Sequence, residues 1–469
     1  MMQGNRLRVA TAFLAIAAGL VSYTGLEFML EAVQDDFGMS PDETMVLAQV
    51  SSGACLLVVF VVGALADRLG DRRLLNLACA TFGVGSAILG FAGGPALLMV
   101  GQAVAGIGTT AMAIIGLSVL ARTFPDAEHR AKAFGVFALA APAVAIVMPF
   151  LSTGVIDWLN WRWVTVLWVL LSVAVPFMAH RCLPARPEAA QRMELVTPTL
   201  AGVALTGIAL SFSFLRAHSD TGDHGFKAVV SASVGVVALA AVAVVKRRLH
   251  APSLDLRSLR RRGAVPIVVA LFVVNGVNLF FFTYLVLQYR YHQTLLETAA
   301  VLIPPQLTAA AGAMLAGRLS RRWGSAQVAT AAFFAAAVLS LGALLIAAES
   351  SSWFPVVVLT VAALPIGGAV GPLTHAFMDI APEDGSAAAS SVRNAAVNLG
   401  IAVGGLLVVT VIFDELDADT ERTLTAYRQQ AAAFRVAGLF CAGAYMLAGV
   451  LLVLHRHRRR ARGPATGTA

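Results

Sequence analysis

Charged residues are scarce in this chain: only 13% of its 469 residues are Asp, Glu, Lys or Arg. A soluble domain typically carries about 25% charged residues and 45–50% apolar ones. Here 58% of the residues are hydrophobic. The composition therefore argues against an ordinary soluble enzyme or binding domain and predicts an integral membrane protein.

Several chemical signatures are also missing. The four cysteines lie in or beside apolar runs and share no metal-like spacing, so we interpret them as small buried hydrophobic residues. The chain lacks the G-x-x-x-x-G-K-[ST] phosphate loop, which makes ATP an unlikely energy source. No nucleophile–base pair stands in a loop long enough to form a soluble active site. We therefore expect no enzyme activity, no metal and no cofactor.

What the sequence has instead is a series of apolar runs, each near the roughly 20 residues that a membrane-spanning helix needs. Candidate spans lie at 9–31, 45–66, 73–93, 96–121, 131–154, 162–180, 196–215, 227–246, 264–289, 295–317, 326–348, 353–378, 389–413 and 432–454. The sequence thus predicts an all-α polytopic membrane protein with fourteen transmembrane helices. An even number of spans places both termini on the same side.

Lys and Arg are distributed unequally between the two sides. With the N-terminus in the cytoplasm, 26 of the 34 basic residues lie in inside segments and seven in outside segments. Cytoplasmic loops of membrane proteins carry such an excess, so we expect both termini in the cytoplasm and the protein in the inner cell membrane. The basic run 455–462 follows the last span, where it would anchor that helix to anionic lipid; a nucleic-acid partner is not expected.

The segment that joins the second and third spans is short and highly charged. Residues 63–73 read GALADRLGDRR, which resembles the signature G-x-L-A-D-R-x-G-R-R of the major facilitator superfamily. The resemblance implies that Asp67 braces one half of the protein against a helix start of the other half in one access state. We therefore expect a conformational latch made of Gly63, Asp67, Arg68, Gly70, Arg72 and Arg73.

A weak internal repeat agrees with that resemblance. Residues 317–324 read GRLSRRWG and follow the tenth span as residues 63–70 follow the second, with Arg321 in the place of Asp67. Transporters are often built from two related halves with the substrate site between them. We expect a six-helix half at 1–185, two linking helices within 186–250, and a second six-helix half at 251–469.

Further motifs resemble the fourteen-helix drug:proton antiporter family, whose members are multidrug efflux pumps. Trp161-Arg-Trp-Val164 is similar to W-R-W-[IV]-F, and residues 251–260 are similar to P-L-L-D-L-R-L-F-R. Residues 284–289 look like Y-L-P-L-Y-L-Q, and Arg393 with Gly400 keeps the spacing of R-Q-x-G-x-x-x-G-x-A. The resemblance implies export of small hydrophobic or amphiphilic compounds in exchange for protons.

The chain also departs from that family's pattern. Ser22 stands where the first span usually has Asp, and Gln102 stands where the fourth span usually has an Arg linked to proton coupling. Of the span-5 signature G-P-x-x-G-G, only Pro142 remains. The departures put the family's usual coupling route, and with it the coupling ion, in question.

Two carboxylates in the first span are the candidates for proton coupling. Glu27 and Glu31 are one turn apart and share a helix face. An ionised carboxylate within a span costs about 2.5–3.5 kcal/mol on insertion scales, so such residues usually titrate or pair. The alternative is that the span ends early and both residues face external water.

The remaining polar groups within the spans form a second set of candidates. Arg393, at the start of the thirteenth span, is a gate candidate, with lipid anchoring as the alternative. Other polar side chains are expected to line a substrate cavity, although hydrogen bonds between helices explain them as well. These cavity candidates are Asn275, Asn278, Gln288, Gln306 and His375.

The sequence as a whole predicts a secondary active exporter that works by alternating access, functions as a monomer in the lipid bilayer and uses the proton gradient. Two alternatives stay open within transport: a dedicated exporter of one endogenous metabolite, or an exporter of a lipid. A further alternative is a membrane sensor or scaffold that transports nothing.

Overall fold

The structure is a computed structural model that describes residues 2–123, 129, 133–134, 137–184, 195–216, 223–248, 264–277, 283, 287, 294–346, 351, 353–380, 386–413 and 424–460. Within these residues the regular structure consists of fifteen α-helices and one short 3-10 helix. The expectation of an all-helical protein is therefore confirmed for the part of the chain that is described.

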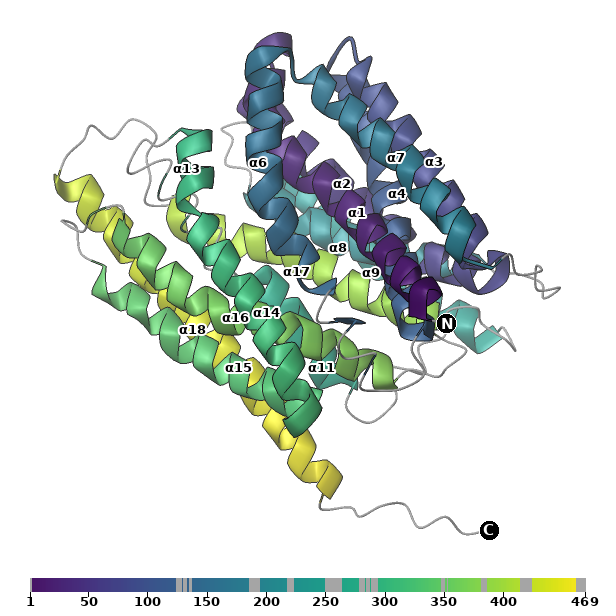
Figure 1. The fold of residues 1–469 in the computed structure, drawn as a ribbon. Coiled ribbons are helices and arrows are strands. Elements are labelled where there is room, and N and C mark those ends of the chain that lie inside the picture. Colours follow the sequence, from purple (N-terminus) through teal and green to yellow (C-terminus); the bar gives the residue numbers. More distant parts are fainter. Residues whose placement is uncertain are drawn as a thin grey trace.

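The first group of helices, drawn in purple and blue in Figure 1, is here called the first bundle. Within it, α3 packs against α4 and α7, and α1 packs against α4, α6 and α7. Its members are α1 (Met2–Phe37), α2 (Pro41–Leu69), α3 (Asp71–Gly90), α4 (Pro95–Thr123), α6 (Ala140–Trp158) and α7 (Arg162–Cys182).

The last group, drawn in green and yellow in Figure 1, is here called the second bundle. It comprises α11 (Ala264–Gly276), α13 (Leu295–Val301), α14 (Ile303–Trp323), α15 (Ser325–Ser340), η1 (Leu341–Leu345), α16 (Trp353–Ile380), α17 (Ser386–Phe413) and α18 (Leu424–Arg460). Between the two bundles in sequence come α8 (Val196–Arg216) and α9 (Asp223–Arg248), which pack against each other.

Ten of the described helices are long and apolar enough to cross a membrane. Three further apolar stretches are shorter, at Val50–Ala66, Val196–Phe212 and Ala264–Gly276. The chain is thus a multi-pass membrane protein, while the count of fourteen spans and the side of the termini stay predictions. In the region of the fifth expected span, 131–154, α6 starts at Ala140 and reaches Trp158. The expected tenth span is divided at Leu302 into α13 and α14.

One tight helix junction occurs twice. Gly70 joins α2 directly to α3 with φ 76° and ψ 158°, and Gly324 joins α14 to α15 with φ 83° and ψ 145°. Residues with a side chain avoid this backbone region, and glycine adopts it at no steric cost. The repeat seen in the sequence therefore corresponds to the same backbone turn in each bundle.

The helix α8 contacts both bundles. Thr206 donates a hydrogen bond from Oγ1 to the carbonyl oxygen of Gly53 in α2, at 3.2 Å. One turn away, Gly202 lies directly on the backbone of Leu57. A small apolar cluster joins α8 to α2 and to α17, through Ala209, Leu56 and Ala402. The helix α8 thus covers the line along which α2 and α17 meet.

We predict that Gly202→Ala destabilises the protein, because a Cβ at this position would collide with the carbonyl oxygen of Leu57. Forcing an extra methyl group into a packed contact costs typically 1–3 kcal/mol, so about that loss is expected. The measurement is the apparent melting temperature in detergent.

The matched control is Gly443→Ala in α18, where an added Cβ would meet no atom within 4 Å. Replacing that helical glycine should leave the melting temperature unchanged or raise it, since alanine favours helices by up to about 1 kcal/mol. Equal melting temperatures for the two variants would contradict the close approach of α8 to α2.

Candidate functional site

The two bundles contact each other at the end of the molecule that contains the Gly70 junction, here called the hairpin end. Gly63 of α2 lies against α17, where a Cβ on it would overlap the hydroxyl of Ser391 and come within 3.4 Å of the carbonyl oxygen of Ala387. A glycine at position 63 is therefore what allows α2 to lie on the first turns of α17. Of the predicted latch residues, Gly63 is placed at the contact with the second bundle.

Arg72 of the predicted latch and its neighbour Asp71 make contacts within the first bundle. Asp71 accepts hydrogen bonds at 3.2 Å from Arg122 at the end of α4, and Arg72 contacts His180 near the end of α7. These contacts fix the start of α3 to α4 and α7. Arg68 is half-buried and Arg73 is exposed. The side chain of Asp67 lies outside the described residues, so its bracing role stays a prediction.

A second contact between the bundles at the hairpin end is aromatic. Phe134 and Phe137, just before α6, pack edge to face with ring centroids 6.4 Å apart. On the side of the second bundle, the ring of His375 lies 5.9 Å from Phe134. The guanidinium of Arg393 lies over the Phe137 ring, 5.1 Å from its centroid. All four side chains are buried.

His375 therefore lies at the bundle contact, where the sequence-based hypothesis placed a cavity residue. Its Nδ1 is 2.9 Å from the hydroxyl of Ser325 at the start of α15 and 3.2 Å from a carboxylate oxygen of Asp379. These contacts hold the ring between α15, α16 and the aromatic pair. Sequence reasoning did not single out Phe134 and Phe137, because aromatic residues are common in apolar chains and nothing in their spacing marks a contact.

Glu27 lies on a face of α1 that points away from two of its neighbouring helices. A Cβ on Gly25 would touch Trp168 of α7 and Met148 of α6, at 2.9 Å and 3.1 Å. Two residues further along a helix is a rotation of about 200°, so Glu27 faces away from α6 and α7. Its side chain is exposed, although Leu26 and the two residues that follow it are buried.

Gln102 and Ser22, the neutral residues that stand where the drug:proton antiporter family usually has Arg and Asp, are both buried. Gln102 has no exposed surface, and neither polar atom of its amide has a hydrogen-bond partner; the hydroxyl of Ser22 is likewise buried and unpartnered. Gly19 of α1 meets Thr109 of α4. Because α1 and α4 run in opposite directions, Gln102, two turns before Thr109, is near the level of Leu26. Polar uncharged groups thus occupy the interior of the bundle beside the exposed Glu27.

The other predicted cavity residues are not brought together by the described structure. Asn275 is half-buried, and its amide donates to the carbonyl oxygen of Leu271 at 2.8 Å, within its own helix. Gln306 is half-buried in α14. Asn278, Gln288 and the side chain of Glu31 lie outside the described residues. Their assignment to a substrate cavity stays a prediction.

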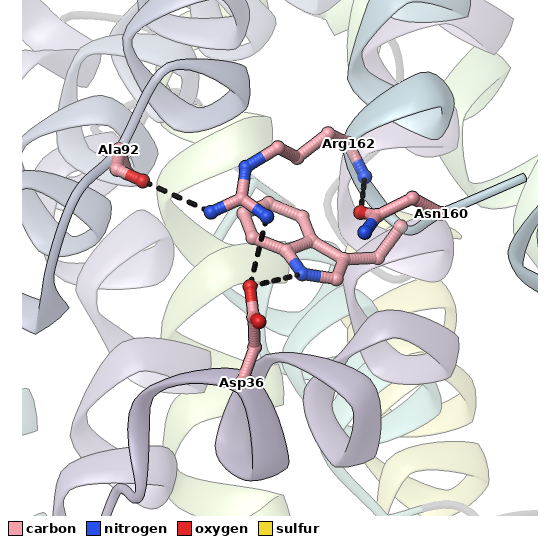
Figure 2. Close-up of polar contacts among 5 residues, drawn as sticks. Asp36, Ala92, Asn160 and Arg162 are labelled. Carbon is pink, nitrogen blue, oxygen red and sulfur yellow. Dashed lines mark hydrogen bonds and ion pairs between the residues drawn. The ribbon is translucent and has the colours of Figure 1, made fainter.

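The opposite end of the first bundle is held by an acid that the sequence analysis did not single out. Asp36, at the end of α1, accepts hydrogen bonds from Trp161 Nε1 at 3.1 Å and from Arg162 Nη1 at 2.8 Å (Figure 2). Arg162 also donates to the carbonyl oxygen of Ala92 at 3.3 Å. Its guanidinium stacks on the Trp161 ring at 4.4 Å, and Trp161 is almost fully buried.

This cluster joins the end of α1 to the loops before α4 and α7. The indole of Trp161 and then the guanidinium of Arg162 hold the pKa of Asp36 below its usual value. Trp161 and Arg162 were noticed in the sequence only for their resemblance to a family motif. A Trp-Arg pair immediately before a span, with acids at the end of another span, is the signal that points to such a contact.

Two bundles of long apolar helices that contact each other, with a helix pair between them in sequence, define a polytopic membrane protein built from two helical units. Comparison with known proteins identifies the family to which the chain belongs. The sequence profile of the Major Facilitator Superfamily matches residues 11–405. The chain belongs to this superfamily, whose members are membrane transporters for small molecules and in general are not enzymes.

Several relatives are named for drug resistance. The chain is 31% identical to the puromycin resistance protein pur8 of Streptomyces alboniger over 402 residues, which cover 83% of this chain and 78% of that protein. It is 24% identical to the multidrug efflux pump LfrA of Mycolicibacterium smegmatis over 446 residues, covering 92% and 87%. The predicted relation to drug-efflux proteins of the superfamily is confirmed.

Solved structures confirm the fold. The human organic anion transporter MFSD10 matches with a TM-score of 0.67 at 15% identity, covering 96% of this chain and 99% of its own. The proton:xylose symporter XylE matches with a TM-score of 0.66 at 13% identity, covering 97% and 96%. At these identities the likeness concerns the fold alone.

We predict that Asp36→Asn lowers the melting temperature at neutral pH, because the amide loses the ion pair with Arg162 and weakens the indole hydrogen bond. Both Asp36 and Arg162 are partly exposed, so the loss should be at most about 1 kcal/mol. Since the folded-state pKa of Asp36 is depressed, its stabilisation is present above the unfolded value of about 3.9 and is lost as the pH falls through the folded pKa.

The check is a melting series in detergent from pH 7 down to about pH 3, with Asp35→Asn as the matched control. Asp35 is the exposed neighbouring acid. The difference between the wild type and Asp36→Asn should shrink at the acid end. A difference that stays constant over the series, or an equal loss in the Asp35 variant, would rule out this role for the Asp36 carboxylate.

Proposed function

We propose that this protein is a secondary active exporter of small hydrophobic or amphiphilic compounds, including drugs and antibiotics. The observation that carries the proposal is the similarity, over most of both chains, to proteins named for resistance to puromycin and for multidrug efflux. A resistance protein of this superfamily protects a cell by moving the compound outward. We assign the protein to the inner cell membrane, as a monomer with fourteen spans.

In the proposed cycle the two bundles rock against each other and expose a central site alternately to each side. The excess of basic residues assigns the hairpin end to the cytoplasm. Parting of Gly63 from Ser391 and of Phe137 from Arg393 then opens the path from the cytoplasm. Closing them again shuts that path in the proposed cycle; both contacts are made in this structure. Arg393 is therefore the proposed gate residue.

Proton exchange is assigned to Glu27. The carboxylate has exposed surface within a membrane span, where contact with water would let it exchange protons, and the usual acid and base positions of the family hold the neutral Ser22 and Gln102. Moving one proton across a potential of 100 mV supplies about 2.3 kcal/mol. In its charged form, Glu27 would also attract a cationic substrate. Export therefore exchanges one or more protons for the compound.

We predict that Glu27→Gln abolishes proton-driven accumulation of a cationic dye such as ethidium in everted membrane vesicles, because the amide cannot carry a proton. Dye binding to the purified protein should persist. Asp35→Asn, which changes an exposed acid outside the apolar span, is the control and should transport like the wild type. Unchanged proton-driven accumulation in Glu27→Gln would refute the coupling assignment.

We predict that Asp67→Asn abolishes turnover while the affinity for ethidium survives. The physical reason is that a latch changes the balance of the two access states but contributes no contact to the substrate. Transport in everted vesicles and equilibrium binding in detergent measure the two properties separately. If binding is lost while turnover continues, the hairpin is part of the substrate site and not a latch.

The choice between broad drug efflux and a dedicated exporter of one metabolite or lipid needs a separate experiment. An untargeted comparison of compounds released by cells with and without the gene distinguishes them. If the release of many chemically unrelated compounds depends on the gene, broad efflux is supported. If only a single metabolite or a lipid depends on it for release, broad efflux is overturned.

A further inference from the structure

Arg393 is a buried guanidinium for which the described part of the chain supplies no carboxylate partner. Only 6% of its surface is exposed. Its Nη1 donates one hydrogen bond to Oδ1 of the adjacent Asn394, at 3.2 Å, and its Nε has no partner. Among the described residues, its guanidinium also lies over the face of Phe137. A charge in such surroundings is expensive, and buried charges in proteins are normally paired.

The side chains described next to Arg393 keep water from this charge, and none of them is a carboxylate paired with it. Phe137 is packed edge to face on Phe134, which is fully buried. Phe134 in turn contacts His375, and the nearby acid of α16, Asp379, lies 3.2 Å from His375. A cation–π contact recovers only part of the hydration that an arginine loses on burial. The positive charge of Arg393 therefore persists in the contact between the bundles.

We propose that Arg393 is an electrostatic barrier to cations, which keeps protons and cationic compounds from passing through the hairpin end while that end is closed. Like charges repel strongly where water is excluded, because the effective dielectric constant is low. Positive charges and oriented dipoles exclude protons and cations in the same way in membrane pores. The inference rests on the proposed function, since only a transporter needs its closed end to resist the gradient that drives it.

Two other roles for Arg393 agree less well with its surroundings. A residue that anchors a helix to lipid headgroups extends its charge to the membrane surface, whereas Arg393 is almost fully buried between the bundles. If the residue at position 393 only had to pack against Phe137, an apolar side chain would serve without the cost of burying a charge. A barrier role requires the charge itself.

The experiment measures passive proton entry in liposomes that contain the purified full-length protein and no transport substrate. A potassium gradient with valinomycin imposes a negative internal potential, and an enclosed pH-sensitive dye reports protons. We expect Arg393→Gln and the closer isostere Arg393→Met to raise the protein-dependent proton entry about tenfold. In both variants the positive charge of the arginine no longer repels the entering proton at the closed contact. Arg393→Lys keeps the charge and should leak as little as the wild type.

Gel filtration and the melting temperature report whether each variant is folded. Because two uncharged variants are made, the test still works if one of them folds poorly. Wild-type leak in Gln and Met variants that remain folded would overturn the proposal. An equal leak in the Lys variant would also overturn it, because packing and not charge would then seal the contact. Ethidium transport by the wild type, measured in the same liposomes, separates this outcome from a failure of the proposed function.

Discussion

The fold depends on the close approach of helix backbones at small residues. In a bilayer the lipid tails are as apolar as the side chains, so helices associate through packing and not through a hydrophobic driving force. In the first bundle, Gly108 of α4 lies on the backbone of Phe82 in α3; in the second, Gly312 of α14 lies on Leu364 of α16. Any side chain at either glycine would push the two helices apart. Large apolar residues are then left to face the lipid.

The same constraint determines how the two bundles meet. Where α2 lies on α17 near the hairpin end, the contact is made by Gly63 and small residues of α17, and further along the two helices Leu56 packs near Ala402. At the hairpin end the contact is also aromatic and cationic, between Phe137 and Arg393. The helix α8 covers the meeting line of α2 and α17 from the outside. The contact between the bundles at the hairpin end therefore has two parts: an apolar part around Gly63 and a charged part around Arg393.

Local features of the structure were predictable from the sequence, and contacts between distant segments were not. Gly70 and Gly324 indicated both helix junctions, because so tight a turn requires a residue that tolerates a positive φ. The family and the run of spans followed from motifs and apolar runs. Nothing in the sequence linked Phe134 to His375, since their contact depends on how two bundles far apart in the chain are docked. Asp36 was overlooked because its partners Trp161 and Arg162 are more than 100 residues away in the chain, at the start of another helix of the same bundle.

The two charged groups that we propose for the transport cycle would require opposite surroundings, and the described side chains differ in this way. A carboxylate that exchanges protons must reach water, and Glu27 is exposed on the face of α1 that points away from α6 and α7. A charge that blocks cations must stay away from water and counterions, because either would screen it. Arg393 is buried under Phe137 and has no carboxylate partner among the described residues. In the proposed cycle, parting of the bundles at the hairpin end would hydrate Arg393 and weaken its field. The proposed motion that opens the path to the cytoplasm would therefore also remove the barrier.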